Sequence, residues 1–512
     1  MGHAIGIDVG STNTKVVLID EDGTLVARAS RPTATTLRGS IGEQDAEAVW
    51  DAVCDALTEL TASAPAAAGV STVGVCSQYS STVAVGADLR PLAPMVTYFD
   101  TRGTDLCWAI MERHPDAFAT WVERHGIPPI GGGLSLAHVL HLQLERPEVH
   151  EATTAYLEVM DFVTTRLTGT VNATQCTQFT SQLCDNRTVG HERYDDDLIA
   201  LAGIDASRLP PLVPIDGVAG TVTPEASART GLPVGVEVRV GMNDSHAGAF
   251  ATGALRPDRA GLMVGTTAVL LQGMDRLAVD LDHEVLSMPA PVPDGYLVWA
   301  ENGVAGKAVA HVLDELLLAD DVLGHPGAAD GFANLDAALE ASPPGARGLL
   351  FLPWLAGSLS PRADRGQRGA LLGLSFESRR VDVVRAAVEG TAHNLRWLLP
   401  HVEAFSGRPA GEVVFGGGAA RSDGWAQIIA DVLSRPVVVL DEPDLAAARA
   451  VASVALQRHR GEVPTEASVP VRRTVDPSAA AASRYDDAHA AFVDAFDATR
   501  PLVERLSVPV VP

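Results

Sequence analysis

The sequence has few positive charges. Its 38 Lys and Arg residues face 64 Asp and Glu residues across 512 positions, so the formal net charge is −26. A charge of that sign repels the phosphate backbone of a nucleic acid and the anionic surface of a membrane, so we expect neither as a partner. One phosphorylated ligand remains compatible with it, provided that its site supplies local hydrogen-bond donors.

Cysteine is also scarce. The five residues, Cys54, Cys76, Cys107, Cys176 and Cys184, are an odd number and show no CxxC spacing. This pattern argues against a disulfide framework and against a zinc site, and it favours a reducing compartment. The start shows no basic-then-apolar leader, and no apolar run reaches about 18 residues. We therefore expect a cytoplasmic protein without membrane segments.

The chain has enough apolar residues for sizeable hydrophobic cores, because hydrophobic residues make up 46% of it and charged residues 20%. The length exceeds the roughly 250–300 residues at which a single core stops growing, so two domains are expected. A change of pattern near residues 245–257 marks their boundary. We predict one domain at 1–250 and a second at 251–512, the latter ending in an outer helix over 482–506.

The N-terminal pattern predicts an α/β fold. "AIGIDV", "KVVLID" and "LVARAS" are apolar, lie between turn-forming residues and indicate three consecutive strands. Residues 103–200 look mostly helical. "AGLMVGTTAVLLQG" then repeats the strand, turn and strand, which predicts a second half built like the first. Helical periodicity before residue 61 predicts a buried face of Val49, Val53, Ala56, Leu57 and Leu60.

The turn in "GIDVGSTNTK" carries the first chemical signal. Asp8 ends an apolar strand, Gly10 permits close approach of a ligand, and Ser11, Thr12 and Asn13 supply donors before Lys15. This set suits the terminal phosphates of a nucleotide, with Asp8 holding a cation such as Mg²⁺. It is neither a Walker loop nor a GxGxxG turn. A plain hairpin with a structural aspartate is the alternative.

Three later stretches strengthen the signal. Asp244 ends the strand before "SHAGAFATGA", where a carboxylate can accept a hydroxyl proton as a general base. Gly265, Thr266 and Thr267 repeat the glycine and hydroxyl chemistry. "VVFGGGAARSDGW" runs from a strand through three glycines into a helix, which allows the adenosine part of a nucleotide to approach the backbone. Each stretch alone is a weak signal, and the ordered set is a strong one.

The ordered set resembles the FGGY carbohydrate kinases, the sugar and polyol kinases of the actin-like ATPase superfamily. The resemblance runs from "IGIDVGSTNTK" to about Leu456 and includes "EQDAEAVW", "LPWLAGSLSPRADRGQRGALLGLS" and "VVRAAVEGTAHNLR". It implies two ribonuclease-H-like domains that flank a catalytic cleft. It also implies phosphoryl transfer from ATP to a hydroxyl, with a homodimer as the expected assembly.

Roles for single residues follow from this resemblance. Asp244 would be the catalytic base, and Asp8 together with Asp244 would place Mg²⁺. The nucleotide would contact three loops, made of Gly10, Ser11, Thr12, Asn13 and Lys15; of Gly265, Thr266 and Thr267; and of Gly416, Gly417, Gly418 and Ala419.

The acceptor side departs from known members. Gln78-Tyr79-Ser80 stands where xylulokinases usually show Gln-Met-His and glycerol kinases Gln-Arg-Glu, so glycerol is disfavoured and D-xylulose is in doubt. A structural ion pair is the alternative role for Arg102, and core packing is that for Tyr79. The residues expected to contact the acceptor are Gln78, Tyr79, Ser80, Asp100, Arg102 and Asn243.

Two further features complete the pattern. Ser358 and Leu359 stand where the family often shows a Glu-Arg pair. In the helix expected over 381–399, Val384, Val388, Leu395 and Leu399 share one face, so Glu389 and His393 are expected to be structural. The histidines show no metal-ligand spacing such as HExxH, and no metal beyond Mg²⁺ is expected.

The prediction is a ketose kinase that uses Mg²⁺ and ATP and is similar to xylulokinases. A tetritol or pentitol kinase is one alternative, and a catalytically silent sensor of nucleotide and sugar is another. Retention of both Asp8 and Asp244 argues against a sensor, which needs no general base. A mechanical ATPase of the actin-like superfamily is disfavoured by the sugar-side segments.

Overall fold

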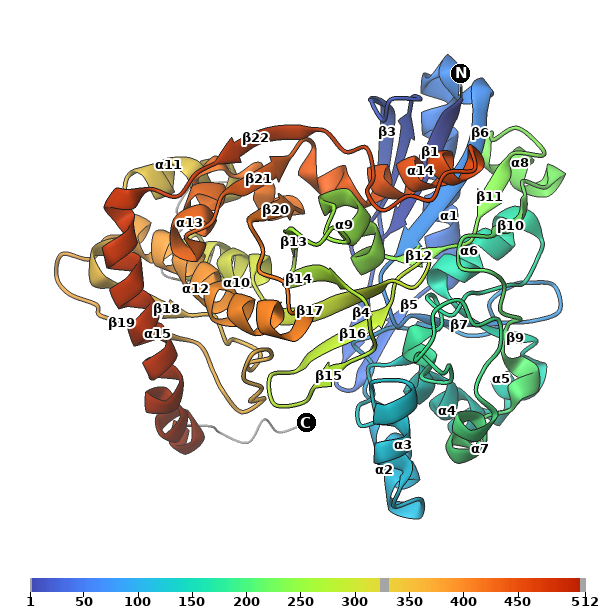
Figure 1. Ribbon diagram of the computed structural model, residues 1–512, viewed down its shortest axis with the longest axis horizontal. Helices are drawn as coiled ribbons and strands as arrows, with labels where there is room; N and C mark the ends of the chain where they lie inside the picture. Colours follow the sequence, from blue (N-terminus) through green and yellow to red (C-terminus); the bar gives the residue numbers. More distant parts are fainter. Residues whose placement is uncertain (1, 323–330, 507–512) are drawn as a thin grey trace.

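The computed structural model describes residues 2–322 and 331–506. Two β-sheets form its frame, with one pair of helices between them and further helices on both outer faces (Figure 1). Alternate residues of each central strand belong to different hydrophobic clusters, because each sheet is covered on both sides. The chain therefore builds a layered α/β molecule, as the sequence predicts.

The first sheet begins with the expected meander. β1 pairs antiparallel with β2, and β2 with β3, while β6 runs parallel to β1. The Ile and Val side chains of these strands alternate between the two covered faces. The strands in order are β10 (Val218–Thr221), β11 (Glu237–Arg239), β6 (Val70–Ser77), β1 (His3–Val9), β2 (Asn13–Ile19) and β3 (Leu25–Pro32), with β12 (Met242–Asn243) beside the end of β6.

The second sheet repeats this plan, which confirms the prediction of two similarly built halves. β13 pairs antiparallel with β14, and β14 with β17, while β20 runs parallel to β13 and β21 to β20. The order is β15 (Val279–Asp280), β16 (Val285–Pro289), β17 (Tyr296–Val304), β14 (Thr267–Met274), β13 (Arg259–Val264), β20 (Glu412–Gly416), β21 (Val437–Leu440) and β22 (Val471–Val475).

Two helices cross between the halves. α9 (Asp244–Thr252) follows the first sheet in sequence but packs on β13, β14 and β20 of the second. α14 (Ala446–His459) follows the second sheet but packs on β1, β2 and β6 of the first, and it also packs against α9. These two helices are therefore the layer between the sheets, and each half is covered by a helix from the other.

The seat of α14 depends on a pair of glycines. Gly6 on β1 lies opposite Gly74 on β6 in the parallel register. A Cβ atom at Gly6 would lie 1.9 Å from the carbonyl oxygen of Ala448, and one at Gly74 would lie 2.3 Å from that of Val451. Because neither position has room for a side chain, the helix backbone rests directly on the sheet.

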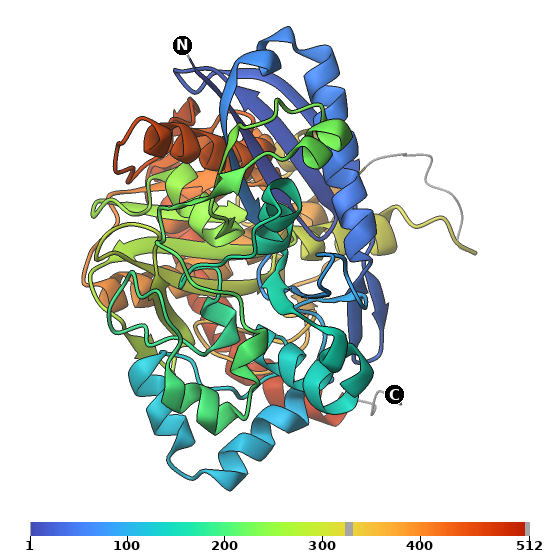
Figure 2. The same cartoon turned by 90° about the vertical axis from the view of Figure 1, so that its right-hand side faces the viewer.

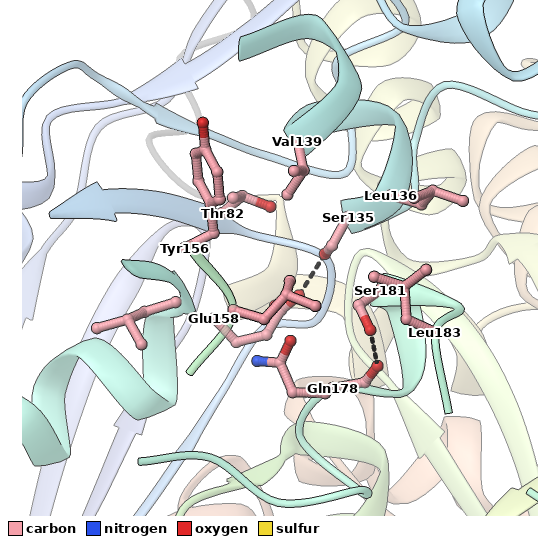
Figure 3. Close-up of a pocket in the computed structure, with 11 residues that line it drawn as sticks. Thr82, Ser135, Leu136, Val139, Tyr156, Glu158, Gln178, Ser181 and Leu183 are labelled. Atoms are coloured by element: carbon pink, nitrogen blue, oxygen red, sulfur yellow. Dashed lines mark hydrogen bonds between the residues drawn. The ribbon is translucent and has the colours of Figure 1, made fainter. Parts of the chain in front are cut away.

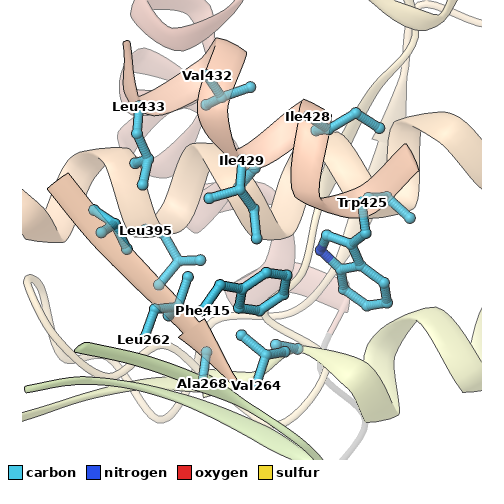
Figure 4. Close-up of a cluster of buried hydrophobic side chains, with 14 of the residues drawn as sticks. Leu262, Val264, Ala268, Leu395, Phe415, Trp425, Ile428, Ile429, Val432 and Leu433 are labelled. Carbon is cyan, nitrogen blue, oxygen red and sulfur yellow. The ribbon is translucent and has the colours of Figure 1, made fainter. Parts of the chain in front are cut away.

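The outer helices cover the remaining faces. α1 (Ala46–Ser63) packs on β2 and β3, and its five expected core residues are all buried. On the second sheet, α12 (Arg380–Ser406) and α13 (Asp423–Leu433) enclose Phe415 (Figure 4). The expected apolar face of α12 is buried as well. α15 (Ala479–Leu506) lies outermost against α12 and α13, as predicted.

A third, smaller sheet extends from the first half, and helices pack below it (Figure 2). The expectation of helix up to residue 200 is wrong after Thr168, because most of the next 27 positions form turns and loops held by buried Thr and Gln side chains. The elements are β4 (Thr36–Arg38), β5 (Ile41–Gln44), β8 (Met95–Val96), β7 (Thr82–Val85), β9 (Ala155–Glu158), α2 (Thr104–Arg113), α3 (Ala117–Arg124), α4 (Ser135–Glu145), α5 (Pro147–Ala152), α6 (Val159–Thr168), α7 (Asp196–Ala202) and α8 (Pro224–Thr230).

The second half also contains shorter elements. They are α10 (Gly306–His311), α11 (Leu335–Glu340), β18 (Leu350–Leu352) and β19 (Ala370–Leu372).

Across residues 2–322 and 331–506, no helix combines the length and the apolar character that a membrane crossing requires. All five cysteines are free and buried.

Gly6→Val tests the seat of α14. The added side chain would overlap the Ala448 carbonyl group, so we expect a loss of about 3 kcal/mol or more in unfolding free energy, measured by denaturant titration. Gly69→Ala is the matched control, because its Cβ would lie 3.7 Å from the nearest atom, an ordinary contact. Equal stability of the two variants would contradict the proposed role of the glycine pair.

Candidate active site

Three strand ends meet at one edge of the first sheet. β1 and β12 both run parallel to β6, which lies between them, so that Asp8 is opposite Cys76 and Asn243 is opposite Ser77. Asp244 is the next residue and begins α9. The sheet thus brings the two predicted carboxylates to the same edge, although they are far apart in sequence.

The carboxyl group of Asp244 is electrostatically unusual. Its pKa rises from 3.8 to about 7, mainly through loss of solvation and then through the negative charges of Asp8 and Glu301. The side chain still reaches solvent at the edge of the sheet. Burial also raises the pKa of Asp8, while Lys15 and the Cys76 thiol, 3.7 Å from Asp8 Oδ1, oppose that rise. A carboxylate that titrates near neutral pH is suited to accept a proton.

The first predicted phosphate turn lies directly after β1. The carbonyl oxygens of Gly10, Ser11 and Thr12 all accept hydrogen bonds from segment 33–35, and Ser11 accepts a second from Gln44. Thr12 is exposed, and Ser11 and Asn13 are half-buried. Because their negative ends are held by the protein, these carbonyl groups do not oppose an anion on the open side of the turn.

Lys15 lies opposite Asp8 in the register of β1 and β2. Its Nζ donates a hydrogen bond of 2.6 Å to the carbonyl oxygen of Asp444, in the turn before α14. In this structure Lys15 therefore joins the first sheet to the second half of the chain. Its expected contact with a phosphate stays a prediction.

The second turn mirrors the first between β13 and β14. Gly265 and Thr266 are exposed, and the carbonyl oxygen of Thr266 accepts hydrogen bonds from the backbone N–H groups of Ala305 and Lys307. Gly306 permits this approach, since a Cβ atom there would lie 2.1 Å from the Gly265 oxygen. Thr267 is half-buried at the start of β14.

The predicted adenosine loop follows β20. Gly417 has a φ of 86°, and a Cβ atom there would lie 2.5 Å from the carbonyl oxygen of Val264, so only glycine fits. Its N–H donates to Pro443, in the same turn that binds Lys15. Gly416 is buried, while Gly418 is exposed with open space beside it and Ala419 is half-buried. The loop thus presents open backbone at Gly418.

The predicted acceptor residues Gln78, Tyr79 and Ser80 directly follow β6, beside the same edge. Gln78 donates its backbone N–H to Val9, and its Nε2 lies 2.6 Å from Gln44 Oε1. Within the described part of the chain, Gln78 Oε1 has no hydrogen-bond partner, and the same holds for Asn243 Nδ2 and Ser80 Oγ. Tyr79 donates to the Cys176 carbonyl oxygen and stacks on Phe179, so part of its role is packing.

Asp100 and Arg102 bind each other. Arg102 Nε donates to both oxygens of Asp100, and Arg102 Nη2 donates to Glu43 Oε1 over 2.6 Å. The backbone N–H of Gly42 completes the pairing of Asp100, whose pKa is lowered by these contacts against the effect of burial. The structural alternative named for Arg102 is therefore present, and a sugar contact would use its remaining donors.

The donor set at the edge suits Mg²⁺ better than a protein-ligated metal. Within residues 2–322 and 331–506, no group of three or more His, Cys, Asp or Glu side chains could hold a metal ion. Asp8 and Asp244 supply hard carboxylate oxygens, and Mg²⁺ bound to phosphates usually takes only one or two carboxylates and water. The two residues therefore fit the predicted ion.

Comparisons with known proteins agree with this geometry. Sequence models of the FGGY family of carbohydrate kinases match the chain in two parts, the N-terminal domain at residues 3–251 and the C-terminal domain at 260–456. The chain belongs to the FGGY family of carbohydrate kinases.

Relatives and solved structures extend over nearly the whole kinase. It is 27% identical to the xylulose kinase of Bacillus subtilis (strain 168) over 445 residues, which is 86% of this chain and 85% of that protein. It is 24% identical to the gluconokinase of Bacillus licheniformis over 85% and 84%. The crystal structure of xylulose kinase from Rhodospirillum rubrum superimposes with a TM-score of 0.81 at 27% identity, covering 98% and 100%.

Sequence reasoning missed several residues of the kinase that surround the site. Partial burial raises the pKa of Tyr98, and the nearby charges of Asp244 and Glu301 raise it further. Tyr98 and Glu43 lie in stretches that carried the family resemblance, so they could have been named. Cys76 and Glu301 could not, because each lies within an apolar strand and only the sheet brings it to Asp244.

A cavity of about 10 Å³ lies behind the acceptor loop, large enough for about one water molecule and too small for a sugar (Figure 3). Glu158 lines it and accepts hydrogen bonds from Ser135, from Thr180 Oγ1 and from the backbone N–H of Ser81. Burial raises the pKa of Glu158. The cavity is thus part of the support for residues 78–81, and it has no room for the predicted acceptor.

Ser358 and Leu359, which stand where the family often shows a Glu-Arg pair, lie next to the second sheet. Ser358 exchanges backbone hydrogen bonds with Asp364, and the carbonyl oxygen of Ser360 accepts one from Asn302 on β17. Burial raises the pKa of Glu301, the neighbour of Asn302, and the positive charge of Arg365 opposes that rise. The segment therefore contacts the strand whose carboxylate raises the pKa of Asp244.

Asp244→Asn tests the raised pKa in the folded state. Because the pKa of Asp244 is higher in the folded than in the unfolded chain, its ionisation lowers stability progressively as pH rises from about 4 to 7. The variant should therefore gain thermal midpoint over the wild type, with a difference that widens between pH 4 and pH 8. In an Asp8→Asn background the widening should shrink. A difference independent of pH would contradict the raised pKa.

Proposed function

We propose that this kinase transfers the γ-phosphoryl group of ATP to a hydroxyl of a ketose, as a xylulokinase-like enzyme. The observation that carries the proposal is the carboxyl group of Asp244, with a pKa of about 7, beside Asp8 at the strand edge. The two turns that carry glycine and hydroxyl residues lie in equivalent places, one after β1 in the first sheet and one after β13 in the second. This is the arrangement expected for a nucleotide held between two similar halves.

Asp244 is the general base in this proposal. An ionised carboxylate oxygen of Asp244 takes the proton of the acceptor hydroxyl. The hydroxyl oxygen forms a bond to the γ-phosphorus, and the bond between that phosphorus and the leaving oxygen of ADP breaks. A base with a pKa near the working pH is ionised often enough and still binds the proton well. Positioning and charge neutralisation provide most of the catalysis in phosphoryl transfer.

The nucleotide lies across the three loops in this proposal. The turns at 10–13 and 265–267 contact its phosphates, and the loop at 416–419 contacts adenosine. Asp8 and Asp244 hold Mg²⁺, in part through water, and that ion neutralises phosphate charge when bound. Lys15 adds positive charge next to Asp8.

A neutral acceptor fits the charges better than an aldonate. Asp8, Asp244 and Glu301 make the edge negative, and the guanidinium group of Arg102 is already paired with Asp100 and Glu43. A carboxylate on the substrate would meet repulsion there. Relatives include both a xylulose kinase and a gluconokinase, and this arrangement favours the uncharged ketose. A tetritol or pentitol is the second candidate, because it is also neutral and rich in hydroxyls.

Location and assembly belong to the same proposal. Five buried, free cysteines are compatible with the reducing cytoplasm. A homodimer is proposed from the family resemblance, and sedimentation of the purified protein measures it.

A coupled assay of ADP release tests the activity. We expect ADP from the wild type only with a ketose or polyol in a panel of pentuloses, hexuloses, pentitols, tetritols, glycerol and gluconate. Asp244→Ala should lower kcat by about a thousandfold or more, because a missing general base alone costs about 10²–10⁴-fold. ADP release without acceptor would indicate an ATPase, and nucleotide binding without any turnover would indicate a sensor.

The pH dependence of kcat/KM gives a second test. Since the proton-accepting form of Asp244 is lost below a pKa of about 7, kcat/KM should fall tenfold per pH unit on the acid side. Removing the negative charge of Asp8 favours ionisation of Asp244, so Asp8→Asn should move this limb to lower pH in whatever activity remains. An acid limb near pH 4 in the wild type would contradict the assignment of the base.

A further inference from the structure

Two side-chain amides connect the acceptor residues with the first phosphate turn. Gln78 Nε2 donates to Gln44 Oε1 over 2.6 Å, and Gln44 Nε2 donates to the carbonyl oxygen of Ser11 over 3.1 Å. Both glutamine side chains are buried, with 2% and 4% exposure for Gln44 and Gln78. The chain of bonds therefore runs without water from Gln78, the residue after β6, through β5 to the turn.

The direction of this chain is determined by its end. A backbone carbonyl group only accepts hydrogen bonds, so Gln44 must present its NH₂ group to Ser11 and its oxygen to Gln78. Gln78 must then donate, and its own oxygen remains without a partner. Because reversal of either amide would place two oxygens or two NH₂ groups together, the orientation of one glutamine determines that of the other.

The strand that carries Gln44 contacts the rest of the acceptor set. The N–H of Gly42 binds Asp100, and Glu43 binds Arg102. Three consecutive residues of β5 thus contact three of the predicted acceptor residues, and Gln44 alone continues to the phosphate turn. A shift of Gln78 would reach Ser11 through this one side chain.

We propose that Gln44 is a positioning residue that couples the acceptor site to the phosphate turn, so that occupation of one site strengthens binding at the other. The identity of the two ligands rests on the proposed function. Coupling of this kind is reciprocal, and it requires a continuous network with defined geometry, which the paired amides supply.

A double-mutant cycle on nucleotide affinity tests the coupling without any turnover. The dissociation constant of a nonhydrolysable ATP analogue with Mg²⁺ is measured by calorimetry for the wild type, Gln44→Met, Gln78→Met and the double variant. Gln78 belongs to the acceptor side, yet we expect its replacement to weaken nucleotide binding about fivefold, as Gln44→Met does. The double variant should be no weaker than Gln44→Met, because both substitutions break the same chain of bonds.

Gln272→Met is the matched control. Gln272 is likewise a buried glutamine, fully shielded, whose Nε2 donates to the Arg408 carbonyl oxygen and whose oxygen accepts from Ser406, away from the site. It should lose stability without a change in nucleotide affinity. Thermal midpoints of all variants separate loss of folding from loss of coupling.

Gln44→Glu adds a reversible test. When protonated, the introduced carboxyl group offers one donor and one acceptor, as the amide does, whereas its ionised form sets an oxygen against the Ser11 oxygen. Nucleotide affinity of this variant should recover as pH falls, relative to the wild type at the same pH, and Gln44→Met should show no recovery.

The outcomes distinguish the two proposals. A wild type that does not bind the analogue would overturn the proposed function and the coupling with it. Binding by the wild type, with additive effects of the two substitutions or an effect of Gln78→Met no larger than that of Gln272→Met, would overturn the coupling alone.

Discussion

The close contact of α14 with the first sheet is the constraint on which the rest of the arrangement depends. Gly6 and Gly74 lie side by side, and their missing side chains let the helix backbone rest on β1 and β6. The turn that begins α14 then holds Lys15 through Asp444 and Gly417 through Pro443. The packing of this one helix on the sheet thus positions Lys15 and Gly417, which lie in different halves of the chain and more than 400 residues apart.

Negative charge, rather than an array of cations, characterises the strand edge. Loss of solvation, and then the negative charges of Asp8 and Glu301, hold the pKa of Asp244 near neutrality. Of the predicted acceptor residues, Arg102 is paired with Asp100, and it also forms an ion pair with Glu43. This arrangement keeps one carboxyl group able to exchange a proton near pH 7.

Much of this could be predicted from the sequence, and the limits have physical causes. The strands, the repeated turns and the faces of α1 and α12 follow from local periodicity, so they were predictable and are present. The helical prediction beyond Thr168 failed because buried Thr and Gln side chains bind the backbone there and replace helical hydrogen bonds. Cys76 and Glu301 gave no local signal. Gln44 lies in a stretch that carried the family resemblance, but its contacts could not be predicted because they join residues distant in the chain.

The sequence by itself determined the family, the α/β architecture and the residue types at each strand end, because motifs and periodicity are local properties of the chain. Only the tertiary structure decided that α9 and α14 exchange sheets, that Lys15 binds Asp444, and that Gln44 lies between Gln78 and Ser11. Those outcomes depend on which surfaces can approach closely and which buried polar groups then remain to be paired. Local sequence does not carry that information.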